Sequence, residues 1–191
     1  MKQIYLARHA ETVEPEYRSV GQLLIDFQTR SNFGNEPLSE KGKEEARILA
    51  QAIKETFKPD GHYYLFTPPN VHRMTETALI LCQELGIYAG QGDSMWFTLQ
   101  ELNPRLGITG VELDAIVERY ENHPYKQYED QVSFNGAIMV TSHSVIPSLA
   151  TFIARKHNFA EIPYLGIVKT GHAVYLDLEN RTSTILPNDI T

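Results

Sequence analysis

The chain has 191 residues, a formal net charge of −7 and one cysteine, Cys82. The length suits a single domain, and the acidic balance argues against a nucleic-acid or anionic-membrane surface, since both attract a basic face. One cysteine excludes an internal disulfide bond, and because neither a signal-peptide pattern nor a long apolar run is present, we expect a cytoplasmic protein.

The first half of the sequence predicts two strands, each followed by a helix. Residues 3–8 are mostly apolar, as in a buried strand, and an irregular segment follows them up to about residue 36. Ser39 is a suitable N-cap for a helix with apolar residues at spacings of three and four: Ala46, Leu49, Ala50, Ile53 and Phe57. The aromatic-rich residues 62–66 predict the second strand. The helix after it has an apolar face: Met74, Ala78, Leu81 and Leu85.

The second half contains the clearest strand of the chain and a closing hairpin. Residues 87–108 fit no single pattern, whereas residues 110–122 predict a helix. The apolar residues 137–143 predict a buried strand that leads directly into another helix. Two alternating segments within residues 172–187 predict a hairpin.

Strands and helices alternate along the chain, and the strands read as apolar runs. This pattern predicts a three-layer α/β/α sandwich around a largely parallel sheet, with the final hairpin as an antiparallel edge. No linker divides the sequence, so we expect one domain over residues 1–191. Two segments, at about 13–36 and 88–132, are predicted to be insertions that leave this core.

Three residues of chemical interest follow predicted strands. His9 follows the first strand, Arg73 follows the second after a short loop, and His143 ends the strand at 137–143. Because ligands in open α/β sheets bind beyond the carboxyl ends of the strands, these residues are expected at one edge. If Asn70 and Ser144 cap the two helices, Arg73 and His143 also lie at helix N-termini, where backbone N–H groups favour an anion.

With Arg8, this edge combines two arginines and two imidazoles. The combination suits a phosphate group, because the planar guanidinium group of arginine can donate two parallel hydrogen bonds to phosphate oxygens. Each residue alone also fits a blander interpretation: His9 and His143 as core histidines bonded to the backbone, and Arg73 as a solvated residue. The order of four sequence segments decides between the phosphate site and these blander interpretations. These are ARHAET (7–12), PLSEKGKEEA (37–46), TPPNVHRMTETA (67–78) and MVTSHSVIPSLA (139–150).

These four segments resemble, in the same order, the motifs of the histidine phosphatase superfamily, also called the phosphoglycerate mutase-like family. The resemblance implies that His9 attacks phosphorus and forms a phosphohistidine. It further implies that Arg8 and Arg73 bind the phosphoryl oxygens, that His143 donates a hydrogen bond to them, and that no metal or other cofactor is needed. One departure is Ala10, which stands where the family usually has glycine.

The family also uses a carboxyl group that protonates the leaving group and later activates water. The resemblance assigns this role to Glu101, while Glu112 is the rival and Glu11 a weaker one. Arg105 and Thr12 are further candidates for substrate contacts. The default interpretation of Arg105 is an ordinary solvated charge.

We therefore expect a metal-independent phosphatase that hydrolyses phosphomonoesters through a phosphohistidine intermediate. The segment 13–36 is long enough to cover the pocket, which favours a small phosphorylated metabolite as the substrate. Alternatives stay open: a phosphoprotein phosphatase, phosphohistidine included, a phosphoglycerate mutase-type phosphotransferase, or a non-catalytic binding protein on the same fold. The sequence carries no signal for the oligomeric state.

Overall fold

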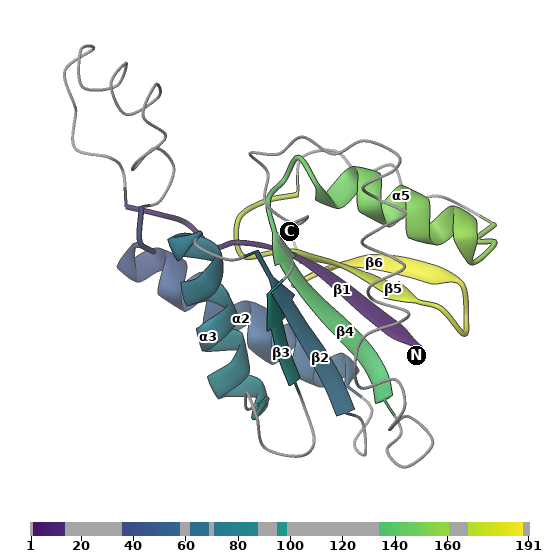
Figure 1. Ribbon diagram of the computed structural model, residues 1–191, viewed down its shortest axis with the longest axis horizontal. Coiled ribbons are helices and arrows are strands. Elements are labelled where there is room, and N and C mark those ends of the chain that lie inside the picture. The colour runs from purple at the N-terminus through teal and green to yellow at the C-terminus, as the bar shows by residue number, and fades with distance from the viewer. Residues whose placement is uncertain are drawn as a thin grey trace.

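The computed structural model describes residues 2–13, 36–57, 62–68, 71–87, 95–98, 134–160 and 168–188. In these ranges six strands form one sheet: β1 (Gln3–Arg8), β2 (His62–Thr67), β3 (Met95–Thr98), β4 (Phe134–Thr141), β5 (Ala173–Asp177) and β6 (Thr182–Leu186) (Figure 1). The helices are α2 (Glu40–Thr56), α3 (His72–Leu85) and α5 (Ile146–Lys156). None of these described helices combines the length and the apolar character needed to span a bilayer.

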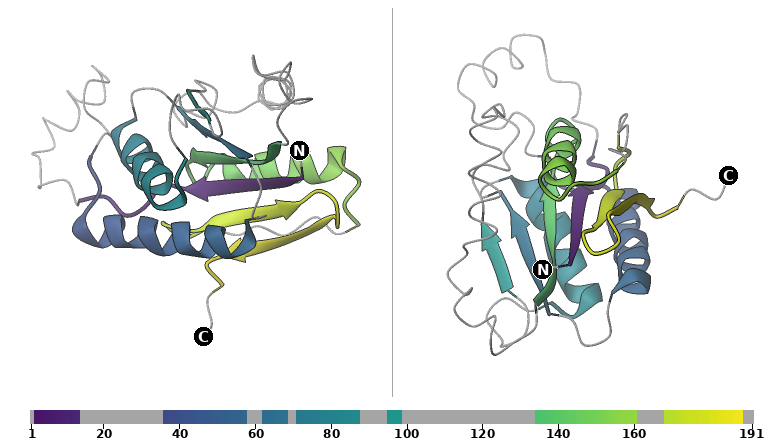
Figure 2. Two further views of the ribbon diagram at one scale, coloured as in Figure 1. Left: turned by 90° about the horizontal axis from the view of Figure 1, so that it is seen from below. Right: turned by 90° about the vertical axis from the view of Figure 1, so that its right-hand side faces the viewer.

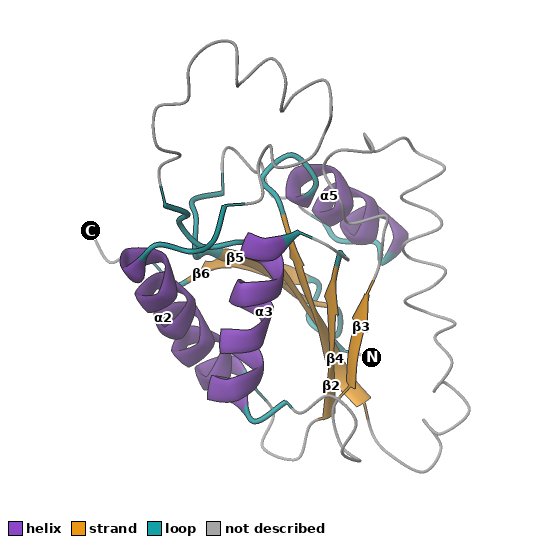
Figure 3. Ribbon diagram, turned by 60° about the vertical axis from the view of Figure 1, so that its left-hand side comes forward, coloured by secondary structure: helices purple, strands orange, loops and turns teal. Residues whose placement is uncertain are grey.

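The sheet has the order β3-β2-β4-β1-β5-β6 and is mixed. Strands β3, β2, β4 and β1 run parallel, whereas β5 is antiparallel to both β1 and β6. Helices α2 and α3 lie side by side on one face, and α5 covers the other (Figures 2 and 3). The predicted three-layer sandwich with an antiparallel edge is therefore confirmed.

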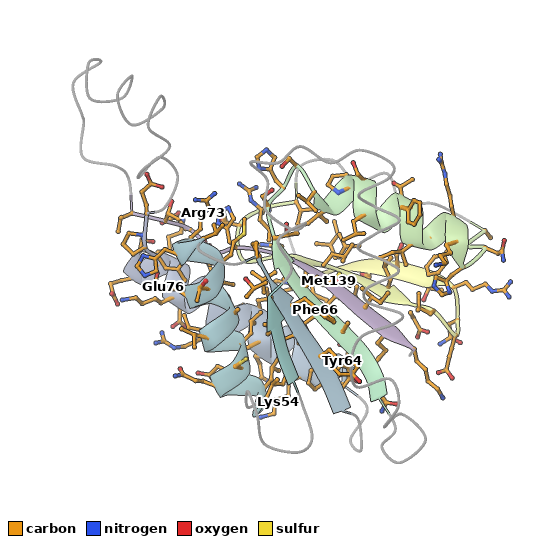
Figure 4. All side chains as sticks on the ribbon, viewed as in Figure 1. Lys54, Tyr64, Phe66, Arg73, Glu76 and Met139 are labelled. Carbon is orange, nitrogen blue, oxygen red and sulfur yellow. The ribbon has the colours of Figure 1, made fainter. Side chains whose placement is uncertain are left out.

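Alternation of side chains along the strands produces two cores. In β1, Ile4 and Leu6 pack into the cluster beneath α5, while Tyr5 and Ala7 pack into the cluster beneath α2 and α3. The cluster beneath α5 also contains Tyr64, Phe66 and Met139, which Figure 4 labels on β2 and β4. Burial on both faces explains why these parallel strands read as continuous apolar runs.

The helix starts agree with the sequence only in part. Ser39 caps α2 as predicted, because its side chain accepts a hydrogen bond from the Gly42 N–H at 2.9 Å. Helix α3 is capped by Val71 and α5 by Val145, neither with a side-chain hydrogen bond. Both valines are buried, so packing rather than capping determines where these helices begin.

The strand β3 lies in the range that the sequence left unassigned. Its residues pair with β2, so the sheet extends into the segment predicted as an insertion at 88–132. The rest of that insertion lies outside the described residues, as does segment 14–35. The described residues on either side of 14–35 are in contact, because Thr12 bridges Leu38 and the Val13 N–H donates to the Pro37 carbonyl at 3.1 Å.

A buried hydrogen-bond network joins β1, β2, β5 and α2 near the start of β1. The Gln3 amide group donates to the Thr56 carbonyl at 3.0 Å and to the Tyr175 hydroxyl at 2.7 Å. The Tyr63 hydroxyl donates to the Gln3 side-chain oxygen. Gln3 thus satisfies three polar groups in a region packed with aromatic rings, among them Tyr5 stacked on Tyr175 at 5.0 Å.

We expect Gln3→Leu to destabilise the protein by about 2–3 kcal/mol, because the buried Tyr63 hydroxyl loses its hydrogen bond to Gln3, as do two partly buried groups, the Thr56 carbonyl and the Tyr175 hydroxyl. Urea unfolding followed by circular dichroism measures this loss. The control is Gln51→Leu on the exposed side of α2, which should change the free energy of unfolding little. Equal effects of the two substitutions would contradict the structural role given to the Gln3 network.

Candidate functional site

Four predicted site residues lie at one edge of the sheet, where the parallel strands end. Arg8 at the end of β1 is in register with Thr141 at the end of β4, so His9 and His143 follow neighbouring strand ends. Arg73 lies in the first turn of α3, which starts at the same edge (Figure 4). The Arg73 Nε lies 3.3 Å from the His9 Nε2, so segments far apart in sequence meet here.

The contacts of His9 determine which ring nitrogen carries its proton. The Nδ1 atom lies 2.9 Å from the Ala10 carbonyl oxygen, which can only accept a hydrogen bond. The Nε2 atom faces the Arg73 Nε–H, which can only donate. Both contacts are satisfied by one neutral tautomer, in which Nδ1 is protonated and Nε2 presents its lone pair.

The surroundings of His9 favour this neutral form. Burial lowers the pKa of His9 from 6.5 to about 4, and the positive charges of Arg73 and Arg8 act in the same direction, while the Ala10 carbonyl opposes them. The unfolded chain therefore binds a proton at higher pH than the folded one. The stability that neutral His9 contributes is complete above pH 6.5 and is lost as the pH falls towards about 4.

Arg8 is held by the segment that precedes β5. Its backbone N–H donates to the His172 carbonyl at 2.8 Å, and its Nη1 donates to the Val168 carbonyl at 2.5 Å. Its Nε is buried, and among the described residues it finds no hydrogen-bond acceptor. Because an unsatisfied buried donor is costly, this N–H is a group that a bound anion would satisfy.

The loop after β1 is fixed by backbone contacts with its neighbours. The His9 N–H donates to the Thr141 carbonyl at 3.0 Å, and the Ala10 N–H donates to the Thr77 hydroxyl at 3.1 Å. The same hydroxyl donates to the Arg73 carbonyl at 2.8 Å, so Thr77 connects the His9 loop to the helix of Arg73. Sequence reasoning missed this contact, because a threonine on a helix gives no signal for it.

The departure at Ala10 is accommodated by packing. Its methyl group is fully buried in a small apolar cluster with Leu38 and Ala46. The segments that carry these two residues, on either side of Ser39, therefore lie directly against the His9 loop. An alanine therefore fits at this position, where its methyl group packs against Leu38 and Ala46.

Of the other predicted site residues, the structure describes His143 and Thr12 but not the remaining three. His143 is exposed, and its charge is among the influences on His9. Thr12 lies next to the His9 loop, in the bridge with Leu38. Glu101, Glu112 and Arg105 lie outside the described residues.

The side chains at the described part of the edge suit an anion. They are two arginines, one neutral imidazole whose Nε2 lone pair faces the Arg73 Nε–H, and one exposed imidazole. Three or more side chains arranged to hold a metal ion do not occur in the part of the chain that the structure describes. The arrangement suits nucleophilic attack by nitrogen on an anionic group bound by the guanidinium groups.

Comparison with known proteins finds similarity in structure only. No protein-family model and no curated protein sequence matches the chain. Among solved structures, the protein histidine phosphatase SixA in complex with tungstate matches with a TM-score of 0.53 and 15% identity, over 96% of this chain and 93% of that one. A mycobacterial glucosyl-3-phosphoglycerate phosphatase in complex with VO3 matches with a TM-score of 0.53 and 13% identity, over 97% and 98%.

A third match is phosphoglycerate mutase from Plasmodium falciparum, with a TM-score of 0.51 and 15% identity over 98% of this chain and 90% of that chain. All three proteins belong to the histidine phosphatase superfamily. The chain therefore has the phosphoglycerate mutase-like fold that the four sequence motifs predicted. At these identities the matches show the fold and leave activity to be argued from the site.

We expect nuclear magnetic resonance to find His9 titrating near pH 4, because burial and two arginines disfavour its charged form. Arg73→Gln should raise this pKa, since it removes one of the positive charges. The matched variant Arg73→Lys keeps the charge and should keep the pKa low. A midpoint of about 6.5 in the wild-type protein would contradict the buried, cation-flanked environment described for His9.

Proposed function

We propose that this protein, with its phosphoglycerate mutase-like fold, is a phosphatase that hydrolyses phosphomonoesters through a phosphohistidine on His9. The observation that carries the proposal is the pairing of His9 with Arg73. The Nε2 lone pair of a neutral imidazole faces a guanidinium group at 3.3 Å, so nucleophile and anion-binding group converge on one point. In addition, solved phosphatases share the fold over nearly the whole chain.

In the first step, the phosphoryl group of the substrate takes the place of the Nε2 contact with Arg73. The His9 Nε2 lone pair forms a bond to phosphorus, and the ester P–O bond breaks. The imidazole becomes cationic, and its Nδ1–H remains on the Ala10 carbonyl. Arg8 and Arg73 neutralise the charge spread over the phosphoryl oxygens, and His143 donates a further hydrogen bond.

In the second step, water replaces the leaving group. Glu101, protonated at the outset, gives its proton to the departing alkoxide and then accepts a proton from the attacking water. The P–N bond breaks, its electron pair returns to Nε2, and inorganic phosphate leaves. Glu112 is the alternative group for this proton transfer.

The proposed substrate is a small phosphorylated metabolite. The small-substrate hypothesis agrees with one structural match, a phosphatase of glucosyl-3-phosphoglycerate. The competing hypothesis, a phosphoprotein substrate, agrees with another, a protein histidine phosphatase. The exposure of His143 is compatible with both, so the choice between them is made by assay.

We expect the protein to hydrolyse a generic aryl phosphate, and the rate to be unchanged by a chelator because arginines supply the positive charge. His9→Ala should abolish turnover, whereas His72→Ala, an exposed histidine next to Arg73, should not. Phosphate release from the aryl phosphate is compared with phosphate release from a protein that carries phosphohistidine. We expect the small substrate to react faster. Activity that a chelator removes would overturn the mechanism.

The assignment of the proton donor is tested with leaving groups of different basicity. Glu101→Ala should slow hydrolysis of alkyl phosphates by about 10²-fold or more, because alkoxides need a proton to leave. Activated aryl phosphates should be affected much less. The same pair of rates is measured for Glu112→Ala, and equal losses on both substrates in Glu101→Ala would move the role away from Glu101.

A further inference from the structure

The side chain of Glu45, in the second turn of α2, reaches the loop that carries His9. Its Oε2 accepts a hydrogen bond from the Glu11 backbone N–H at 2.9 Å. Glu11 is two residues after the proposed nucleophile. The Glu45 side chain is only 21% exposed, so this bond is partly shielded from water. A carboxylate that accepts a backbone N–H makes a strong, charge-assisted bond.

Two glycines allow this close approach. A Cβ atom at Gly171 would lie 2.6 Å from the Glu45 Cβ, and one at Gly42 would lie 1.9 Å from the Glu11 carbonyl oxygen. Gly171 also has a φ of 64° and donates its N–H to the His9 carbonyl at 3.4 Å. Glu45 is therefore packed between the backbone after His9 and the turn before β5.

The charge of Glu45 also acts on the anion site. Burial lowers the pKa of Arg8, and the nearby Glu45 carboxylate acts in the opposite direction. Glu45 contacts Lys41 at 3.6 Å, but Lys41 is largely exposed, so its charge is well screened by water. The negative charge of Glu45 therefore offsets part of the positive charge that the arginines concentrate at the site.

We propose that Glu45 is a positioning residue, which fixes the loop of His9 through the Glu11 N–H and moderates phosphate affinity through its charge. This inference rests on the proposed phosphatase function. It differs from a purely structural role in its two separate effects. The hydrogen bond of Glu45 affects kcat, whereas its charge affects the affinity for phosphate. The two effects are separable, since glutamine keeps an acceptor oxygen and loses the charge.

The test compares Glu45→Ala, Glu45→Gln and the matched control Glu44→Ala, whose side chain is exposed and paired with Arg47 on the same helix. Steady-state kinetics on an aryl phosphate give kcat and KM, and calorimetry with inorganic phosphate gives the dissociation constant. Glu45→Ala should lower kcat by about 10- to 100-fold, because small displacements of a reacting group are costly. Glu44→Ala should match the wild type.

Glu45→Gln should recover most of kcat and bind inorganic phosphate about two- to fivefold more tightly, because a negative charge near the arginines has gone. Circular dichroism confirms that each variant is folded, and Glu45→Gln keeps the test valid if Glu45→Ala does not fold. If the wild type is active but Glu45→Gln binds inorganic phosphate no more tightly than Glu44→Ala does, this inference alone is overturned. An unchanged kcat in a folded Glu45→Ala also overturns it. A wild type inactive on the aryl phosphate overturns the proposed function and this inference together.

Discussion

The parallel pairing of β1 with β4 is the constraint on which the site depends. It places Arg8 opposite Thr141, so that the residues after both strands leave the sheet at the same edge. The His9 N–H donates to the Thr141 carbonyl, which continues the pairing one step beyond the strand. A shift of one residue in this register would exchange the faces of β1, so that Tyr5 and Ala7 would enter the core beneath α5 and Ile4 and Leu6 the core beneath α2 and α3. Core packing thus also determines the position of His9.

The same edge of the sheet holds positively charged groups close to an imidazole that would also be positive if it were protonated. Two guanidinium groups lie near an imidazole, and burial together with these charges keeps the imidazole neutral. Backbone carbonyls hold much of the arrangement: Ala10 orients the His9 ring, and Val168 binds Arg8. Carbonyl oxygens attract cations without adding a full negative charge, which leaves the edge suited to an anion. Preorganisation of this kind reduces the rearrangement needed when charge develops on a bound group.

The sequence predicted those parts of the molecule that depend on local pattern. Residues 3–8 and 137–143 were recognisable as strands because strands buried on both faces are apolar throughout, although the second strand is Phe134–Thr141 in the structure. His9, Arg73 and His143 were expected at one edge because they follow predicted strands, and the ordered motifs agreed with this placement. The short strand β3 gave no such signal, because four residues are too few for a period. The helix starts at Val71 and Val145 were missed because tertiary burial determines them. Contacts such as those of Thr77 and Glu45 depend on which helices lie together, which a single sequence does not reveal.

The bridge between Thr12 and Leu38 couples the His9 loop to the start of α2. The Val13 N–H donates to the Pro37 carbonyl, and the Ser39 N–H donates to the Glu11 carbonyl. The His9 loop is also tied to α2, α3 and the sheet by further hydrogen bonds. A displacement of α2 would therefore move the His9 loop with it, so the position of the proposed nucleophile depends on a helix that carries neither an arginine nor a histidine of the site.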